Sequence, residues 1–184
     1  HRDAVDDRGV ALQLAVLYNG RKDSKRAIEL ASQIVKADAE NWQAMRVRAD
    51  AYLNVGNQKE ALADYEAALK LSPKDTGILN NLAWLLATSP NEKLRDAKRS
   101  IELAEQACQI TSYKAPHILS TLAAGYAEKG DFATAKKWSN KAIETAENEE
   151  EKTGLRKELK SYEDGKPWRE ELTGAVDKPD TERK

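Results

Sequence analysis

The chain has 184 residues, of which 40% are hydrophobic and 33% are charged, a balance typical of a folded domain with charged helix surfaces rather than of a disordered chain. The 30 Lys and Arg residues nearly match the 31 Asp and Glu residues, so the net charge of -1 disfavours a nucleic-acid-binding protein. No run of about 18 apolar residues occurs, and the sequence therefore predicts no membrane insertion.

The N-terminal part predicts two helices, over residues 4–19 and 24–37, with the turn signal Asn19-Gly20 between them. The first of these helices carries apolar side chains on more than one face, so its outer side is expected to contact something else. The chain starts with His1-Arg2 instead of Met and shows no signal peptide. We therefore expect a piece of a longer protein, whose cellular location the sequence leaves open.

Helical periodicity continues to about residue 163, and no segment shows the alternation of a strand, which predicts an all-α fold. The five prolines fall at predicted helix boundaries, as proline chemistry requires. Asp23 or Ser24, and Asp131, are placed to cap helices. The further predicted helices span residues 41–54, 58–71, 75–87, 94–110, 116–129, 132–146 and 148–163.

The ninth predicted helix carries Leu155, Leu159 and Tyr162 in one stripe, at spacings of four and three residues. Such a helix can cover the last hairpin with its apolar face and present a polar face to water. Gly165 is suited to end it. Trp168 is expected to fold back onto the helices before it, and the residues from 173 onward are weakly specified.

Four segments share one pattern of small and apolar positions, and they start at Ala27, Ala61, Ser100 and Ala135, at intervals of 34, 39 and 35 residues. The intervals between these segments, and the pattern of residues upstream of each start, resemble the tetratricopeptide repeat family. The second repeat resembles it most closely, with Arg48 where the family has Leu; we expect its stem to pack and its guanidinium to reach solvent. The matching positions of that repeat are Met45, Arg48-Ala49, Tyr52, Ala61, Tyr65 and Pro73.

This resemblance implies a right-handed α-solenoid of four helical hairpins plus a C-terminal capping helix. The repeats are placed at about residues 8–41, 42–75, 76–114 and 115–147, so that residues 1–147 form the stack, 148–164 the cap and 165–184 a tail. The segment NNLAWLLATSPNEKLRDAKRSIELAEQA and the GKPWRE ending are similar to a subtype common in large bacterial multidomain proteins.

The third repeat has 17 positions between Ala83 and Ser100 where the other repeats have 12. The five extra residues fall within residues 88–95, around Ser89-Pro90-Asn91. They form either an excursion that shapes a binding surface or a tolerated surface insertion, and we favour the insertion because loop length costs little entropy.

Residues for catalysis are scarce, since the chain has two histidines, one cysteine and no phosphate-binding loop. Cys108 lies in an apolar stretch and is interpreted as a core residue. Carboxylate runs such as Glu149–Glu151 are interpreted as solvated surface. The sequence therefore predicts a protein that is not an enzyme and has no cofactor or metal.

In the family, the first helices of successive repeats line a concave groove that binds a peptide or protein segment. The alternatives are that Trp84 belongs to the core, that His117 only starts a helix, and that Arg46 and Asp50 pair with each other. The Lys, Asn and Arg clamp with which some members bind chaperone peptides is absent. Carried over by register, the candidate binding residues are Gln43, Arg46, Asp50, Asn54, Asn80, Trp84, His117, Ser120 and Ala124.

Two functions follow as hypotheses. The first is a protein-interaction scaffold that binds a peptide or protein partner in the groove. The second is a structural spacer or a self-association module, in which the apolar N-terminal edge contacts an upstream repeat, a neighbouring domain or a second copy, because terminal repeats normally need a polar outer side.

Overall fold

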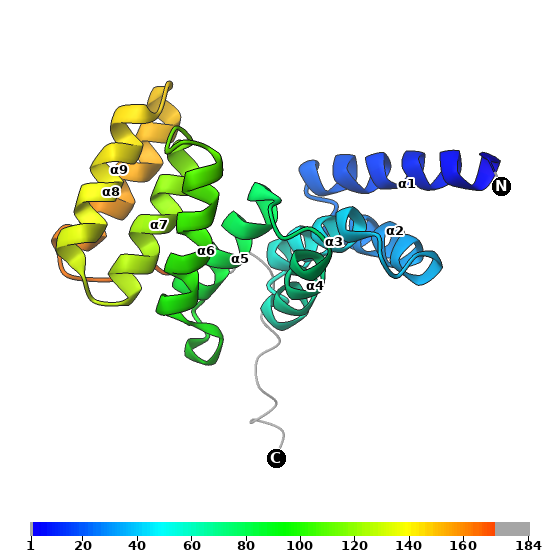
Figure 1. Cartoon of the computed structure of the whole chain (residues 1–184), viewed down its shortest axis with the longest axis horizontal. Coiled ribbons are helices and arrows are strands. Elements are labelled where there is room, and N and C mark those ends of the chain that lie inside the picture. The colour runs from blue at the N-terminus through cyan, green and yellow to red at the C-terminus, as the bar shows by residue number, and fades with distance from the viewer. Residues whose placement is uncertain (1, 172–184) are drawn as a thin grey trace, which may run out of the picture. The chain divides into compact units, whose positions relative to one another are not determined.

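A computed structural model describes residues 2–171, with side chains from Arg8 onward, and all its regular elements are helical (Figure 1). This confirms the all-α fold, and every helix end lies within three residues of its predicted place. None of the described helices is apolar enough over the length needed to cross a membrane. The helices are α1 (Arg2–Gly20), α2 (Ser24–Ala37), α3 (Trp42–Asn54), α4 (Gln58–Leu71), α5 (Thr76–Thr88), α6 (Ala97–Ile110), α7 (Pro116–Glu128), α8 (Phe132–Thr145) and α9 (Glu149–Glu163), with a short 3-10 helix, η1 (Glu92–Leu94), before α6.

The described chain forms two compact units, residues 2–64 and residues 65–170, which we call the N-terminal and C-terminal units. Helices α1, α2 and α3 pack on one another in the first unit. In the second, α5 packs on α6 and α7, α7 on α6 and α8, and α9 on α8. Helix α4 spans the boundary between the units.

Side-chain caps explain why most of these helices start where they do. In each case a carboxylate or amide oxygen just before the helix accepts a hydrogen bond from a backbone N–H of the first turn, which has no partner within the helix. The predicted caps Asp23 and Asp131 are confirmed. At the other end, Gly165 follows α9 with a φ of 68°, a conformation that costs glycine little. The capping residues are Asp23, Asn41, Asp75, Asp96, Asp131 and Asn148.

In the N-terminal unit, Arg48 differs from expectation. Its guanidinium does not reach into solvent but forms a bidentate ion pair with Asp64, at 2.6 Å from Nε to Oδ2 and 2.7 Å from Nη2 to Oδ1. Nη1 also donates to Ser32 Oγ at 3.3 Å. The side chains of Arg48 and Asp64 are only 19% and 11% exposed, because the arginine enters a position that is packed by Leu82 and Leu122 in the later repeats.

Small residues allow the helices of the C-terminal unit to approach closely. Ala83 and Ala123 are fully buried, and Ser100 Oγ donates to the Ala83 carbonyl at 2.8 Å. At Gly125 of α7 an added Cβ would lie 3.0 Å from both Ile101 Cγ1 and Ser100 Oγ of α6. A side chain at this position would therefore crowd α6, and glycine allows the two helices to approach closely. Cys108 is fully buried, as predicted, and burial raises the pKa of its thiol to about 12.

The insertion of the third repeat lies against the protein instead of projecting from it. Asp96 donates its backbone N–H to the Leu86 carbonyl at 2.9 Å, which closes the segment that contains η1. Arg95 donates from Nη1 to the Ser89 carbonyl at 2.9 Å and from Nε to Glu128 of α7 at 2.8 Å. The insertion is thus anchored to α7 by a part-buried ion pair.

After α9, residues 166–170 run back across α7 and reach the end of α5; we call them the C-terminal segment. Trp168 packs against the buried cluster around Ala123, Ala127 and Tyr162, which confirms that it folds back onto the helices. Arg169 forms an ion pair with Glu128 at 2.6 Å, and the Glu170 backbone N–H donates to the Thr88 carbonyl at 3.0 Å. Of the predicted tail, residues 172–184 lie outside the described residues.

Candidate functional site

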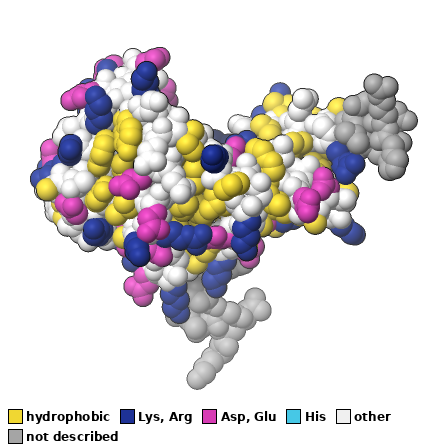
Figure 2. Space-filling view, in the orientation of Figure 1, with side chains coloured by type: hydrophobic (Ala, Val, Ile, Leu, Met, Phe, Trp, Pro, Cys, Tyr) yellow, Lys and Arg dark blue, Asp and Glu magenta, His cyan; other side chains and the backbone are white. Residues whose placement is uncertain are grey.

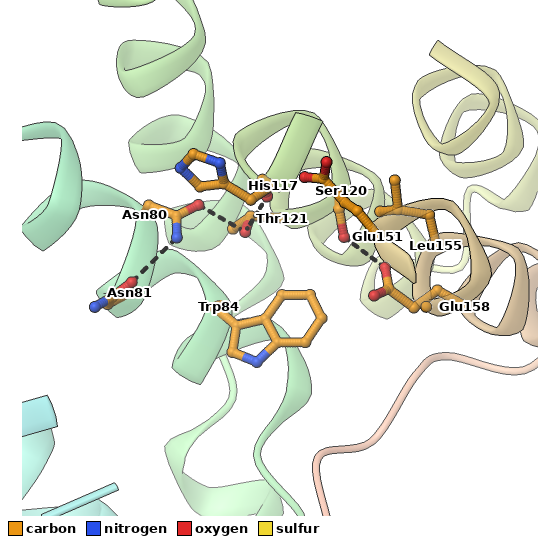
Figure 3. A pocket seen from close by; sticks show the side chains of 10 residues that line it. Asn80, Asn81, Trp84, His117, Ser120, Thr121, Glu151, Leu155 and Glu158 are labelled. Atoms are coloured by element: carbon orange, nitrogen blue, oxygen red, sulfur yellow. Dashed lines mark hydrogen bonds between the residues drawn. The ribbon is translucent and has the colours of Figure 1, made fainter. Parts of the chain in front are cut away.

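A pocket of about 330 Å³ lies between α5, α7 and α9 in the C-terminal unit (Figure 3). Its size is at the lower end of the range of small-ligand sites, about 300–1,000 Å³. All three helices contribute side chains, so the pocket walls stand on rigid elements. The lining residues are Asn80, Asn81, Trp84, His117, Ser120, Thr121, Glu151, Gly154, Leu155 and Glu158.

A polar chain links α5 to α7 at one side of the pocket. Thr121 Oγ1 donates to Asn80 Oδ1 at 2.8 Å and is also 3.1 Å from the His117 carbonyl oxygen. Asn80 Nδ2 in turn donates to Asn81 Oδ1 at 3.1 Å. These bonds fix the orientation of the Asn80 amide and leave it one N–H for further hydrogen bonding.

Trp84 forms the aromatic wall of the pocket. The ring is partly exposed and extends from α5 toward the side formed by α9 (Figure 3). Its Nε1 donates to Glu170 Oε2 of the C-terminal segment at 3.1 Å. The structure thus places this tryptophan on the pocket surface rather than in the interior, and a carboxylate holds one edge of its ring.

The α9 wall carries the carboxyl groups. Ser120 Oγ donates to Glu158 Oε2 at 2.5 Å, across the pocket from α7 to α9. Partial burial raises the pKa of Glu158 to about 7, an effect that the Ser120 hydrogen bond opposes and the nearby charge of Glu170 reinforces. Glu158 therefore holds a proton at a pH at which an ordinary glutamate has lost it.

The predicted binding residues divide between the two units. Asn80, Trp84, His117 and Ser120 come together in the pocket. Ala124 is 2% exposed on α7 and does not line it.

The other four candidates, Gln43, Arg46, Asp50 and Asn54, lie on α3 in the N-terminal unit and are not among the lining residues. Asn54, which is exposed, donates from Nδ2 to Asn19 Oδ1 of α1 at 2.8 Å.

The α9 wall was not predicted as part of the site, although Leu155 was placed on the apolar stripe of this helix. Glu151 was interpreted as part of a solvated run, yet it lines the pocket, and Glu158 was not singled out. Glu151, Leu155 and Glu158 follow one another at spacings of four and three residues, which places them on one helix face. That spacing was a usable signal, because a helix that covers a stack also has a side facing the inner helices.

On the face of the C-terminal unit seen in Figure 2, acidic and basic side chains are interspersed. Among the pocket residues, however, two are glutamates and none is Lys or Arg. The two glutamates give the pocket wall its acidic character.

Comparison with known proteins agrees with this fold. The Pseudomonas aeruginosa protein PilF matches with a TM-score of 0.67 and 20% identity over 87% of this chain and 75% of its own. PilW, a widely conserved type IV pilus biogenesis factor, gives a TM-score of 0.65 and 22% identity over 74% of this chain and 61% of its own. A thermophilic tetratricopeptide repeat protein from Thermus thermophilus gives a TM-score of 0.66 and 19% identity over 88% and 84%. At these identities the likeness concerns the fold alone.

The family assignment comes from the sequence match. A family model described as tetratricopeptide repeat matches residues 12–76 and again residues 48–115. The two matches together run from residue 12 to residue 115, which is more than half of the chain. Proteins with this repeat generally serve as non-catalytic scaffolds for protein–protein interaction. The helical hairpins, their period near 34 residues and these matches show that the chain belongs to the tetratricopeptide repeat family.

Proposed function

We propose that this chain is a protein-interaction scaffold that binds an extended peptide segment of its partner in the pocket between α5, α7 and α9. The observation that carries the proposal is the composition of the pocket wall, in which an indole, an amide, a hydroxyl and carboxyl groups converge from three helices on one open space. Binding sites commonly combine an aromatic anchor with a few oriented polar groups.

The fixed polar groups suit a peptide backbone. Asn80 is held by Thr121 and Asn81, so its remaining N–H points in a set direction and can donate to a carbonyl oxygen. Trp84 is held at its Nε1 edge by Glu170, which leaves the ring face for an apolar or cationic side chain. Little ordering of the site is needed on binding, which favours affinity.

The proposal can be tested by selecting peptides from a random displayed library against the chain and titrating the enriched peptides by calorimetry. We expect Trp84→Ala and Asn80→Ala each to weaken binding by roughly tenfold or more, since both remove pocket contacts. Asn140→Ala, a matched change on the exposed surface of α8, should leave the affinity unchanged within about twofold.

Circular dichroism melting of each variant separates lost contacts from lost folding. Enriched peptides that bind Trp84→Ala and Asn80→Ala as tightly as the original chain would place the binding surface elsewhere. A library that yields no binding peptide at all would contradict the proposal.

Self-association is a second candidate, and it is favoured by the outer face of α1. Val10, Leu14 and Leu17 are 56%, 41% and 47% exposed and follow one another at spacings of four and three residues, so they form one apolar stripe. A second copy could cover such a stripe with its own. Analytical ultracentrifugation should then show concentration-dependent dimers that disappear in Val10→Lys/Leu17→Lys, whereas a monomer at high concentration would contradict self-association.

A further inference from the structure

We infer that the pocket selects a basic side chain, Lys or Arg, in the bound peptide, so that the scaffold recognises a cationic segment. This inference rests on the proposed function and adds the charge of the ligand to it. It is the opposite of the basic clamp that some members of the family use, and that clamp is missing here. The structural basis is a pocket that offers carboxyl groups and an aromatic face but has no Lys or Arg among its lining residues.

The carboxyl groups converge from two parts of the chain. Glu151 and Glu158 line the pocket from α9, and Glu170 reaches its edge from the C-terminal segment, where it holds the Trp84 ring. Glu158 accepts a hydrogen bond from Ser120, a neutral donor, and Glu170 accepts one from the indole, which is also neutral. The hydrogen bonds shown for these two groups thus leave their charge uncompensated.

Several basic residues of α9 and the C-terminal segment pair with acids that do not line the pocket. On α9, Lys152 and Arg156 both pair with Glu149, at 3.6 and 3.0 Å, and Lys160 pairs with Asp164 at 3.0 Å. Arg169 of the C-terminal segment pairs with Glu128 at 2.6 Å. These four cations are thus engaged outside the pocket, and a bound partner is a source of the cation that would balance its carboxyl groups.

The aromatic wall fits the same ligand. A Lys or Arg side chain is attracted to the face of a tryptophan within about 6 Å of the ring centre, and its aliphatic stem packs on the same surface. Trp84 stands between Glu170 at its edge and the α9 carboxyl groups. An ammonium or guanidinium group that stacks on the ring can hydrogen-bond with a carboxylate, and charge-assisted bonds of this kind are stronger than neutral ones.

The protonation of Glu158 provides an independent signature of such a ligand. Its pKa lies at about 7, chiefly because of burial, so at neutral pH the group exchanges between its acid and its carboxylate form. A bound cation favours the carboxylate, and Glu158 then releases its proton to the solvent. The titratable groups around it are Glu151 on its own helix, His117 on α7, Glu170 on the C-terminal segment, and Tyr162, whose phenol pKa is raised mainly by burial.

The experiment uses the full chain and pools of acetylated, amidated hexapeptides in which one position is fixed and the others are mixed. The fixed residue is Lys, Arg, their uncharged counterparts norleucine and citrulline, or Glu. We expect the Lys and Arg pools to bind at least about tenfold more tightly than the norleucine and citrulline pools, since they alone provide a charge-assisted bond. Glu158→Gln and Glu170→Gln should each reduce this ratio to below about threefold, whereas the exposed control Glu150→Gln should retain it.

Calorimetry of a binding Lys peptide at pH 7, in two buffers of different ionisation enthalpy, measures the released proton. We expect up to about half a proton per peptide for the original chain and none for Glu158→Gln. A structural role of Glu158 alone would not produce this difference.

The outcomes separate the two proposals. If the pools bind, depend on Trp84, and show no preference for Lys or Arg, the basic specificity is wrong while the scaffold function stands. If no pool binds, both are wrong. If cadaverine alone displaces the Lys peptide at an equal concentration, the site recognises a free amine and the peptide assignment is overturned.

Discussion

Helices α3 and α5 occupy the same place in successive repeats, yet only α5 contributes to the pocket. The α3 candidates Arg46 and Asp50 follow the same register that brings Asn80 and Trp84 to the pocket wall. The difference comes from a third element, because α9 and the C-terminal segment close the space beside α5 and α7 with Glu158 and other groups. Repeat register thus identifies the face of α5 that lines the pocket, but the pocket itself forms only where α9, which is not a repeat helix, encloses it.

The two units also differ in how they hold buried charge. In the N-terminal unit Asp64 pairs with one arginine, Arg48. In the C-terminal unit Glu128 pairs with two, Arg95 from the insertion and Arg169 from the C-terminal segment. The second arrangement ties two irregular segments to α7, so we expect it to matter more for stability.

The largest effect is expected for Glu128→Ala. The side chain is 14% exposed, and its removal leaves both Arg95 and Arg169 without their carboxylate partner in a part-buried setting. We expect the free energy of unfolding to fall by about 3 kcal/mol. Urea denaturation followed by circular dichroism measures it, and Glu102→Ala, whose side chain is 61% exposed beside Lys98, should change it by less than about 0.5 kcal/mol. Equal effects of the two changes would mean that the insertion is not held through α7.

A smaller effect is expected in the N-terminal unit for Asp64→Ala. Only one arginine, Arg48, loses its partner, and we expect a loss of about 2 kcal/mol. The double change Arg48→Leu/Asp64→Leu should recover most of this loss, because Leu is the residue that packs the same position as Leu82 in the next repeat. A double variant as unstable as the single one would show that Arg48 does more than substitute for an apolar residue.

The pH dependence of stability tests the raised pKa of Glu158, which lines the pocket. The folded state holds a proton on Glu158 up to a pH of about 7, whereas the unfolded chain loses it near the ordinary pKa of 4.5. The folded state therefore binds more protons between these values, and this group's contribution to stability is present below pH 4.5 and is lost as the pH rises through 7. Glu158→Gln should remove a fall on the order of 2 kcal/mol between pH 4.5 and 8, measured by urea denaturation at both pH values. If the original chain and Glu158→Gln showed the same change in the free energy of unfolding between the two pH values, the raised pKa of Glu158 would be contradicted.

Features that depend on local spacing could be predicted from the sequence, and features that depend on tertiary packing could not. Helices and caps were predictable because the positions of Asp23, Asp131 and the apolar residues depend on local spacing alone. Of the site, the α5 and α7 walls were found through register. The spacing of Glu158 places it on one face of α9 but does not say what that face contacts, and both Glu158 and Glu170 reach the pocket only because α9 and the C-terminal segment pack beside α5 and α7.

The smallest effect on stability is expected for Glu170→Gln, a change that tests whether the C-terminal segment orients Trp84. Its bond to Trp84 Nε1 is exposed, so we expect the free energy of unfolding to change by less than about 1 kcal/mol. The indole N–H resonance of Trp84 should nevertheless shift in a nitrogen–proton NMR spectrum, because the amide replaces a charged acceptor, while Glu150→Gln leaves the resonance in place. The backbone bond from Glu170 to the Thr88 carbonyl does not involve the side chain and should keep the segment docked. An unmoved Trp84 resonance would mean that the indole does not depend on this carboxylate and that the side chain of Glu170 does not orient the aromatic wall of the pocket.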